Sequence, residues 1–266
     1  MPFPDYVLTT RTNRMLKGLD AKRISEAKTV KFASPVLPIM WAKLGTPQTG
    51  GEYDGEYGKY RFDLVIDPAD PTAAEFIDRI EQNHASLIKV VEEWKTVNRK
   101  TKLTNFRGAP VHEQTVKVKT NADIEKYQST NPDIDIEIGD YVSTGKYVLK
   151  LSKNAAYNKD GAIIDTPFNI VDSNNRRVPK SILAQIGNGT EVRVALQQAP
   201  YVVSDAAGTC FKVPKIVITK LVKYGEGMVD SDYFGDDDIY TGGFTVDTED
   251  TEENLSAGDV SVSDDF

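Results

Sequence analysis

Alternation of apolar and polar residues is the dominant pattern of this chain. Residues 59–66 alternate between apolar and charged side chains. A period of two predicts a strand with one buried face. Residues 29–41 are also strand-like, but Pro35 and Pro38 interrupt them, which predicts an edge strand or two short pieces. Further strand patterns cover residues 146–153, 191–198 and 210–223.

A helical period follows the strand at 59–66. Asp70 suits the N-cap of a helix, and Pro71 suits its first position. Apolar residues then recur every three or four positions, which predicts one amphipathic helix from Thr72 to Val97, packed on the sheet. The apolar stripe consists of Phe76, Ile80, Leu87, Val91 and Trp94.

Two other stretches have weaker patterns. Residues 45–58 are rich in glycine and predict a loop. Residues 98–145 are polar and predict a hairpin-like insertion, with strands at 116–119 and 134–138. The acids near residue 135 follow strand alternation, so we predict no metal site. Short strands, many turn residues and one long helix favour a small mixed-topology β-barrel or sandwich over a parallel α/β sheet.

Charge divides the chain into unlike parts. The net charge is −8, with 40 acidic and 32 basic residues, but no Lys or Arg follows Lys223. Residues 226–266 hold 14 of the acids, which leaves the preceding residues about +6. This division suggests an anion-binding domain with an anion-mimicking tail. We therefore expect a basic arm at 1–26, a domain at 27–225 and an acidic tail at 226–266 that is disordered in the free protein.

Two interpretations of the ends remain open. The arm either touches nucleic acid or is a solvated lead-in. The tail either confers solubility or is a docking peptide, and the terminal Asp264-Asp265-Phe266 favours docking.

The inventory of reactive residues argues against catalysis. Phosphate-binding GxxxxGK[ST], GxSxG, CxxC and HExxH motifs do not occur. Two histidines and the single Cys210 are a poor set for acid–base or covalent chemistry. We expect no enzyme activity and no cofactor. One cysteine fits a reducing cytoplasm, and without a run of 18 apolar residues we expect no membrane span.

Basic residues alternate with aromatic ones along the predicted strands. Lys59 and Arg61 flank Tyr60, and Lys146 and Lys150 flank Tyr147. Single-stranded nucleic acid requires this mixture, because cations neutralise phosphates and exposed aromatic rings stack on bases. Tyr60 itself lies on the apolar face and is expected in the core.

An ordered set of segments, together with the acidic tail ending in Phe266, matches the pattern of a known protein family. The segments are Gly58-Lys59-Tyr60-Arg61-Phe62-Asp63-Leu64, Asp67-Pro68 with the long helix, Tyr147-Val148-Leu149-Lys150, Ile170-Val171-Asp172-Ser173, Ile186 to Val194, and Ala199-Pro200-Tyr201. With these segments in this order, the chain resembles the single-stranded DNA-binding proteins of short-tailed lytic phages. No single piece is diagnostic, and nothing is carried over for residues before 27 or for 98–145.

The resemblance implies an OB-fold, a five-stranded Greek-key barrel, with an added helix. It implies sequence-independent binding of single-stranded DNA in phage DNA replication, recombination and repair, with strand annealing, as a homodimer in the cytoplasm of the infected host. It also implies that the tail docks on the phage DNA polymerase and the helicase–primase through Asp264, Asp265 and Phe266, and that it competes with DNA for the groove.

The resemblance also ranks the candidate DNA-binding residues. Residues that match the basic and aromatic pattern of the family come first, and further basic and aromatic residues near them follow. The first group is Arg61, Lys150, Arg176, Arg177, Arg193 and Tyr201; the second is Trp41, Tyr57, Tyr147, Lys153 and Tyr157.

Two functions of other classes remain as alternatives. In the first, the chain is a protein-binding adaptor whose acidic tail is the active element. In the second, it is a metal-dependent nuclease that uses carboxylates of the tail or of the insertion. Salt-sensitive DNA binding separates the main hypothesis from the adaptor, and magnesium-dependent degradation of the strand would indicate the nuclease.

Overall fold

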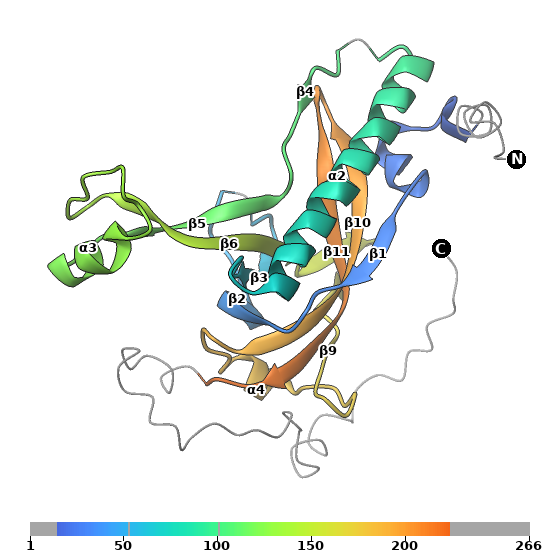
Figure 1. Ribbon diagram of the computed structural model, residues 1–266. Coiled ribbons are helices and arrows are strands. Elements are labelled where there is room, and N and C mark those ends of the chain that lie inside the picture. Colours follow the sequence, from blue (N-terminus) through green and yellow to red (C-terminus); the bar gives the residue numbers. More distant parts are fainter. Residues whose placement is uncertain (1–14, 53, 101, 224–266) are drawn as a thin grey trace, which may run out of the picture.

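A curved, mostly antiparallel sheet forms the body of the molecule (Figure 1). The computed structural model describes residues 15–52, 54–100 and 102–223. Five long strands run in the order β11-β10-β2-β3-β6. A meander of three strands whose first member also pairs with a later hairpin is the topology of an OB-fold, so the predicted fold class is confirmed. The five strands are β2 (Leu37–Gln48), β3 (Lys59–Ile66), β6 (Tyr141–Asn154), β10 (Glu191–Val203) and β11 (Ala206–Lys220).

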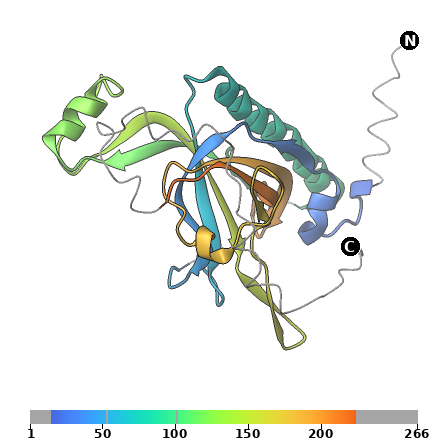
Figure 2. The same ribbon diagram turned by 90° about the horizontal axis from the view of Figure 1, so that it is seen from below.

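Shorter elements extend this frame. Strand β1 pairs with β10, β9 with β11, β4 with β11, and β5 with β6, while β7 and β8 form a separate hairpin. That hairpin projects from the body in Figure 2. Their bounds are β1 (Val30–Ala33), β4 (Asn105–Phe106), β5 (Val111–Lys117), β7 (Ala156–Lys159), β8 (Ala162–Asp165) and β9 (Ile170–Val171); the short helices are η1 (Ala21–Glu26), α3 (Asn121–Gln128) and α4 (Lys180–Leu183).

The long helix α2 (Pro71–Val97) crosses one side of the sheet, as predicted (Figure 1). The carboxylate of Asp70 accepts from the Thr72 N–H at 2.8 Å and caps the first turn. The N-terminal part of the stripe, with Phe76 and Ile80, joins the main core, which also takes up the alternating apolar face of β3. The apolar side chains that repeat every two residues on β3 and every 3.6 residues on α2 therefore face the same interior.

The C-terminal half of α2 has a second core. Leu16 and Ile24, from the expected basic arm, are buried against Trp94. The Trp94 Nε1–H donates to the Leu19 carbonyl at 2.8 Å, and the Asn98 side chain bonds Gly18 and Leu16. The described part of this arm is therefore packed on the helix through Leu16 and Ile24, while its basic side chains, Lys17, Lys22 and Arg23, are exposed.

Several of the predicted boundaries differ from the structure; for example, β6 begins at Tyr141, inside the insertion expected at 98–145. Strand β2 continues to Gln48, inside the loop expected at 45–58. Residues 134–138 form no strand. The Ile136 side chain is instead buried in a small cluster with Val118 and Val142. The insertion also contributes β5 to the main sheet. Within the described residues, no helix is both long and apolar enough to cross a membrane.

Candidate nucleic-acid interface

An open hollow of about 420 Å³ lies on the outer face of the sheet, over β2, β3, β6 and β5. The opposite faces of β3 and β6 carry the main core. Alternation therefore directs Asp63 of β3 and its cross-strand partner Lys150 of β6 outward, into the hollow. The outer face of the second and third barrel strands is where OB-folds bind oligonucleotides, and these strands are β3 and β6 here.

Trp41 is the main aromatic surface of this hollow. It lines the hollow, and 66% of its surface is exposed. The register of β2 against β3 shifts between Met40 and Lys43, so Trp41 lies in a bulge. Its φ of 55° is in the left-handed region, which non-glycine residues seldom adopt. Bulges and such strained residues concentrate at functional sites, where they redirect side chains.

The glycine turn at 187–189 holds this bulge in place. The Trp41 N–H donates to the Asn188 side chain at 2.9 Å. On either side, the Gly189 N–H donates to Ile39 O, and the Ile39 N–H donates to Thr190 O, both at 2.9 Å. Gly189 has φ +88°, a conformation suited to glycine. A turn that resembles the family pattern thus positions an exposed tryptophan 147 residues away from its asparagine.

The charge of the hollow is mixed. Lys150 is exposed, and none of the ion pairs among the described residues includes it. Asp63 is half-buried; burial raises the pKa of its carboxyl, although Lys150 and Arg61 act in the opposite direction. The hollow therefore offers an exposed cation, a flat aromatic ring and one partly desolvated carboxylate.

Exposed cations continue from this hollow across neighbouring strands. Lys43 of β2 and Arg193 of β10 are both exposed, and neither is in an ion pair of the described part of the chain. Lys215 lies on β11, two residues from the partner of Arg193. Adjacent strands are about 4.8 Å apart, so these cations are spaced to contact successive phosphates of a nucleic-acid strand that crosses the outer face.

Arg61 has a different environment from Lys150. Its guanidinium Nη2 lies 2.5 Å from Asp54 Oδ1, and the Asp54 side chain is buried. Asp54 also accepts from the Gly51 N–H at 2.8 Å. This arrangement fixes the loop between β2 and β3 to the sheet, so Arg61 acts here as an anchor of the loop.

Arg176 and Arg177 lie on the turn that follows β9, at the β11 side of the sheet. Asp172 Oδ1 accepts from the N–H groups of Asn174 and Arg176 and so shapes the turn. Both arginines are exposed, and the neighbouring Asn175 binds the Lys215 ammonium. They lie across β11 and β10 from the hollow, in line with Arg193 and not beside Trp41.

The remaining aromatic candidates are scattered. Tyr147 packs against the main core, on the face opposite Lys150, and Tyr57 is half-buried in the β2–β3 loop. Tyr157 is exposed on the β7–β8 hairpin. Tyr201 lies over Gly208, near the far end of the β10–β11 hairpin. Lys153 donates to the Pro167 carbonyl at 3.1 Å, and burial lowers its pKa.

One wall of the hollow was not predicted. Strand β5 contributes Gln114 and Lys117, and Lys119 follows just beyond it. The alternation at 116–119 indicated a strand, but only the pairing of β5 with β6 brings it beside Lys150. Asp264, Asp265 and Phe266 lie outside the described residues.

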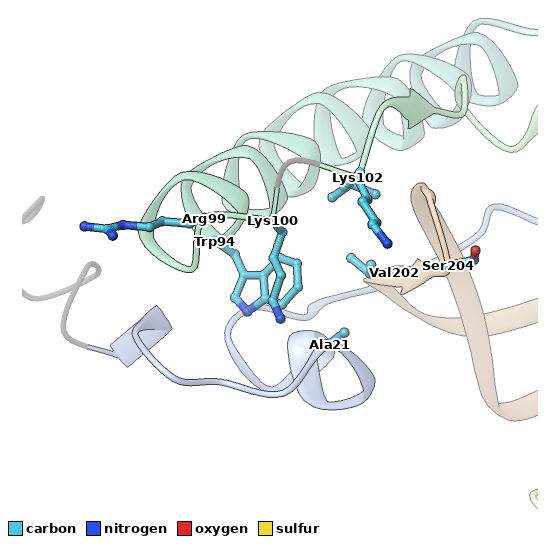
Figure 3. A pocket seen from close by; sticks show the side chains of 8 residues that line it. Ala21, Trp94, Arg99, Lys100, Lys102, Val202 and Ser204 are labelled. Atoms are coloured by element: carbon cyan, nitrogen blue, oxygen red, sulfur yellow. The ribbon is translucent and has the colours of Figure 1, made fainter.

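A second hollow, of about 440 Å³, lies at the other end of the molecule. Trp94, Lys100 and Lys102 line it together with Val202 and Ser204 of the β10–β11 hairpin (Figure 3). The Lys100 ammonium lies 6.0 Å from the centre of the Trp94 ring, whereas Arg99 points away. Trp94 itself is only 1% exposed, so this ring is covered and offers no stacking face.

Comparisons with known proteins identify the family of this chain. Residues 35–221 match the family model described as "Single-stranded DNA-binding protein, Bacteriophage T7". The crystal structure of gp2.5 of bacteriophage T7 is similar at 19% identity, with 75% of this chain and 97% of that chain covered and a TM-score of 0.48. The single-stranded DNA-binding protein of bacteriophage Enc34, in complex with single-stranded DNA, is similar at 12% identity, over 79% of this chain and 97% of that chain, with a TM-score of 0.38. No curated protein sequence matches.

The family match spans β2 to β11 and so includes both Trp41 and Lys150. It covers well over half of the chain and confirms the resemblance drawn from the sequence. The chain belongs to the family of single-stranded DNA-binding proteins represented by that of bacteriophage T7.

Proposed function

We propose that this chain binds single-stranded DNA on the outer face of β2, β3, β6 and β5. One observation carries the proposal: the exposed Trp41, on the first barrel strand, and the exposed Lys150, on the third, line the same open hollow. Trp41 stacks on a base, and Lys150 neutralises a phosphate beside it. Every base has a flat face, so strands of any sequence bind.

The binding domain spans residues 27–225, and the strand continues from the hollow toward Arg193 and the turn with Arg176 and Arg177. The exposed cations on successive strands support this path. Lys150 and Arg193 neutralise phosphates directly, while Arg61 acts by holding the β2–β3 loop. The protein binds the strand without cleaving it.

In the phage-infected host cytoplasm, the protein covers single-stranded DNA during replication, recombination and repair, and promotes annealing of complementary strands as a homodimer. The family assignment supports these roles. The acidic tail recruits the phage DNA polymerase and the helicase–primase through Asp264, Asp265 and Phe266. The 14 acids of the tail follow a body of net positive charge, which supports DNA binding by the body and protein binding by the tail.

The direct test measures binding of the full chain to a fluorescent oligothymidine over a range of salt concentrations. We expect affinity to fall with salt, with a log–log slope of roughly −0.7 for each phosphate contacted. Equal affinity at low and high salt would contradict the proposal. Absence of binding by the full chain, and also by a chain without residues 226–266, would favour the adaptor function instead.

The tail has its own test. Deletion of residues 226–266 removes a competing polyanion, so the shortened chain should bind oligothymidine more tightly and lose stimulation of the polymerase. Weaker DNA binding after the deletion would show that the tail does not compete with DNA.

A further inference from the structure

The Asp63 carboxylate is chemically out of place on a surface that neutralises phosphates. It lines the same hollow as Trp41 and Lys150, and burial opposes its charged form. A phosphate in this position would be repelled by it. A ligand group that donates hydrogen bonds would instead be attracted.

Asp63 is also the unengaged carboxylate of the hollow. Glu113, the other acid lining it, accepts a hydrogen bond from the Ser143 hydroxyl. The nearby Gln114 side chain accepts from Thr144 Oγ1 at 2.9 Å. No hydrogen bond or ion pair within residues 15–52, 54–100 and 102–223 uses the Asp63 side chain, although Lys150 stands directly across the strand pair.

The positions of Asp63 and Trp41 are fixed relative to each other by the sheet. Asp63 pairs with Met40, and Trp41 follows Met40 in the bulge. Side chains directly opposite each other on antiparallel strands have Cβ atoms roughly 4.5–5.5 Å apart. Trp41, Asp63 and Lys150 line the same hollow, so a base stacked on Trp41 would have an edge within reach of Asp63, with its phosphate near the exposed Lys150.

We propose that Asp63 reads the edge of the base that stacks on Trp41, and that it favours bases with an exocyclic amino group over thymine. The amino group of cytosine donates a hydrogen bond to a carboxylate, whereas thymine presents a carbonyl oxygen at the same position. The inference rests on the proposed function, because a base reaches Asp63 only when the strand occupies this hollow. Any sequence still binds, and the preference is graded.

The test compares full-length protein bound to oligothymidine and to an oligomer of 5-methyldeoxycytidine of the same length, at pH 8 and constant salt. The two bases have nearly the same shape and the same methyl group, but at C4 thymine carries an oxygen and 5-methylcytosine an amino group, and only thymine carries a proton on N3. We expect the 5-methyldeoxycytidine oligomer to bind about fivefold more tightly, the lower end of the range for one base contact.

Two variants sharpen the test. In Asp63→Asn the new amide can donate to the thymine oxygen, so the preference should disappear or reverse. In Asp67→Asn, which removes a charge at a carboxylate that pairs with Lys146 and does not line the hollow, the wild-type ratio should persist. Thermal unfolding of both variants checks that the fold is intact.

Three results would overturn the inference. Equal affinity of the wild type for both oligomers would remove the preference alone and leave the proposed function intact. If Asp63→Asn bound both oligomers more tightly but kept the same ratio of affinities, Asp63 would only repel the phosphates and would not read a base. Failure of either oligomer to bind would contradict the proposed function itself, and this inference with it.

Discussion

The two tryptophans of this chain both lie beside hollows lined by lysines, but they occupy opposite environments. Trp94 is 1% exposed, and its indole N–H is bonded to Leu19. Trp41 is 66% exposed, and its backbone is held in a left-handed bulge by Asn188. A nearby lysine therefore does not identify a stacking site. Only an exposed ring can stack on a base, and Trp41 has an exposed ring whereas Trp94 does not.

The largest expected effect is on stability. Trp94→Ala removes a buried ring from the second core, where it contacts the helix, the arm and the β10–β11 hairpin. Large aromatic truncations of this kind cost about 3–5 kcal/mol. Urea denaturation should show this loss in the free energy of unfolding. Trp41→Ala is the matched control and should change stability by less than about 0.5 kcal/mol, as expected for a surface substitution.

The next effect is on DNA affinity, and here the Trp41 substitution is the one that matters. Trp41→Ala should weaken binding of oligothymidine by about 1–3 kcal/mol, the range measured for loss of one stacked base. Trp41→Phe keeps a ring and should restore most of the affinity. Fluorescence anisotropy with a labelled oligomer measures both. Full affinity in Trp41→Ala would mean that the strand binds elsewhere.

A smaller effect distinguishes Lys150 from other exposed lysines. Lys150→Ala should make the log–log salt slope shallower by about 0.7, which corresponds to one lost phosphate contact. Lys89→Ala, on an exposed position of α2, should leave the slope unchanged. The salt series described above provides the measurement. Equal slopes for the two variants would exclude a phosphate at Lys150.

The smallest effect comes from His84 on α2, which does not line the hollow beside Trp41. His84 Nδ1 lies 2.9 Å from Thr209 Oγ1, and burial lowers the pKa of its imidazole. The unfolded chain therefore takes up a proton first as the pH falls through the ordinary value of about 6.5. Stability should be complete above that pH and decline below it, until the lower pKa of the folded state is reached. His84→Gln should flatten this decline in urea titrations, with DNA affinity at pH 8 unchanged.

Much of the frame could be predicted because it depends on local rules. The alternation at 59–66 and the cap at Asp70 gave β3 and α2 close to their observed limits. The resemblance gave the fold class. By contrast, residues 134–138 alternate but form a loop, in which Ile136 packs into a small local cluster.

The site could be predicted only in part. Trp41 and Lys150 were both candidates, but nothing local shows that a bulge at 41, an asparagine at 188 and strand β5 converge on one surface. Tyr147 and Lys150 are three residues apart and face opposite sides of the sheet. Arg61 matched the basic pattern, yet a buried aspartate from a loop engages it. Such long-range contacts depend on register, and register is not encoded in composition.

One measurement tests the central role of Trp41 most directly. The chain has two tryptophans, so intrinsic fluorescence can be followed in the full protein and in Trp41→Phe during titration with oligothymidine. The proposal predicts strong quenching in the wild type, from stacking of a base on Trp41, and little change in Trp41→Phe, whose remaining indole is buried. Equal quenching in both proteins would show that the bound strand does not reach Trp41 and would contradict this account.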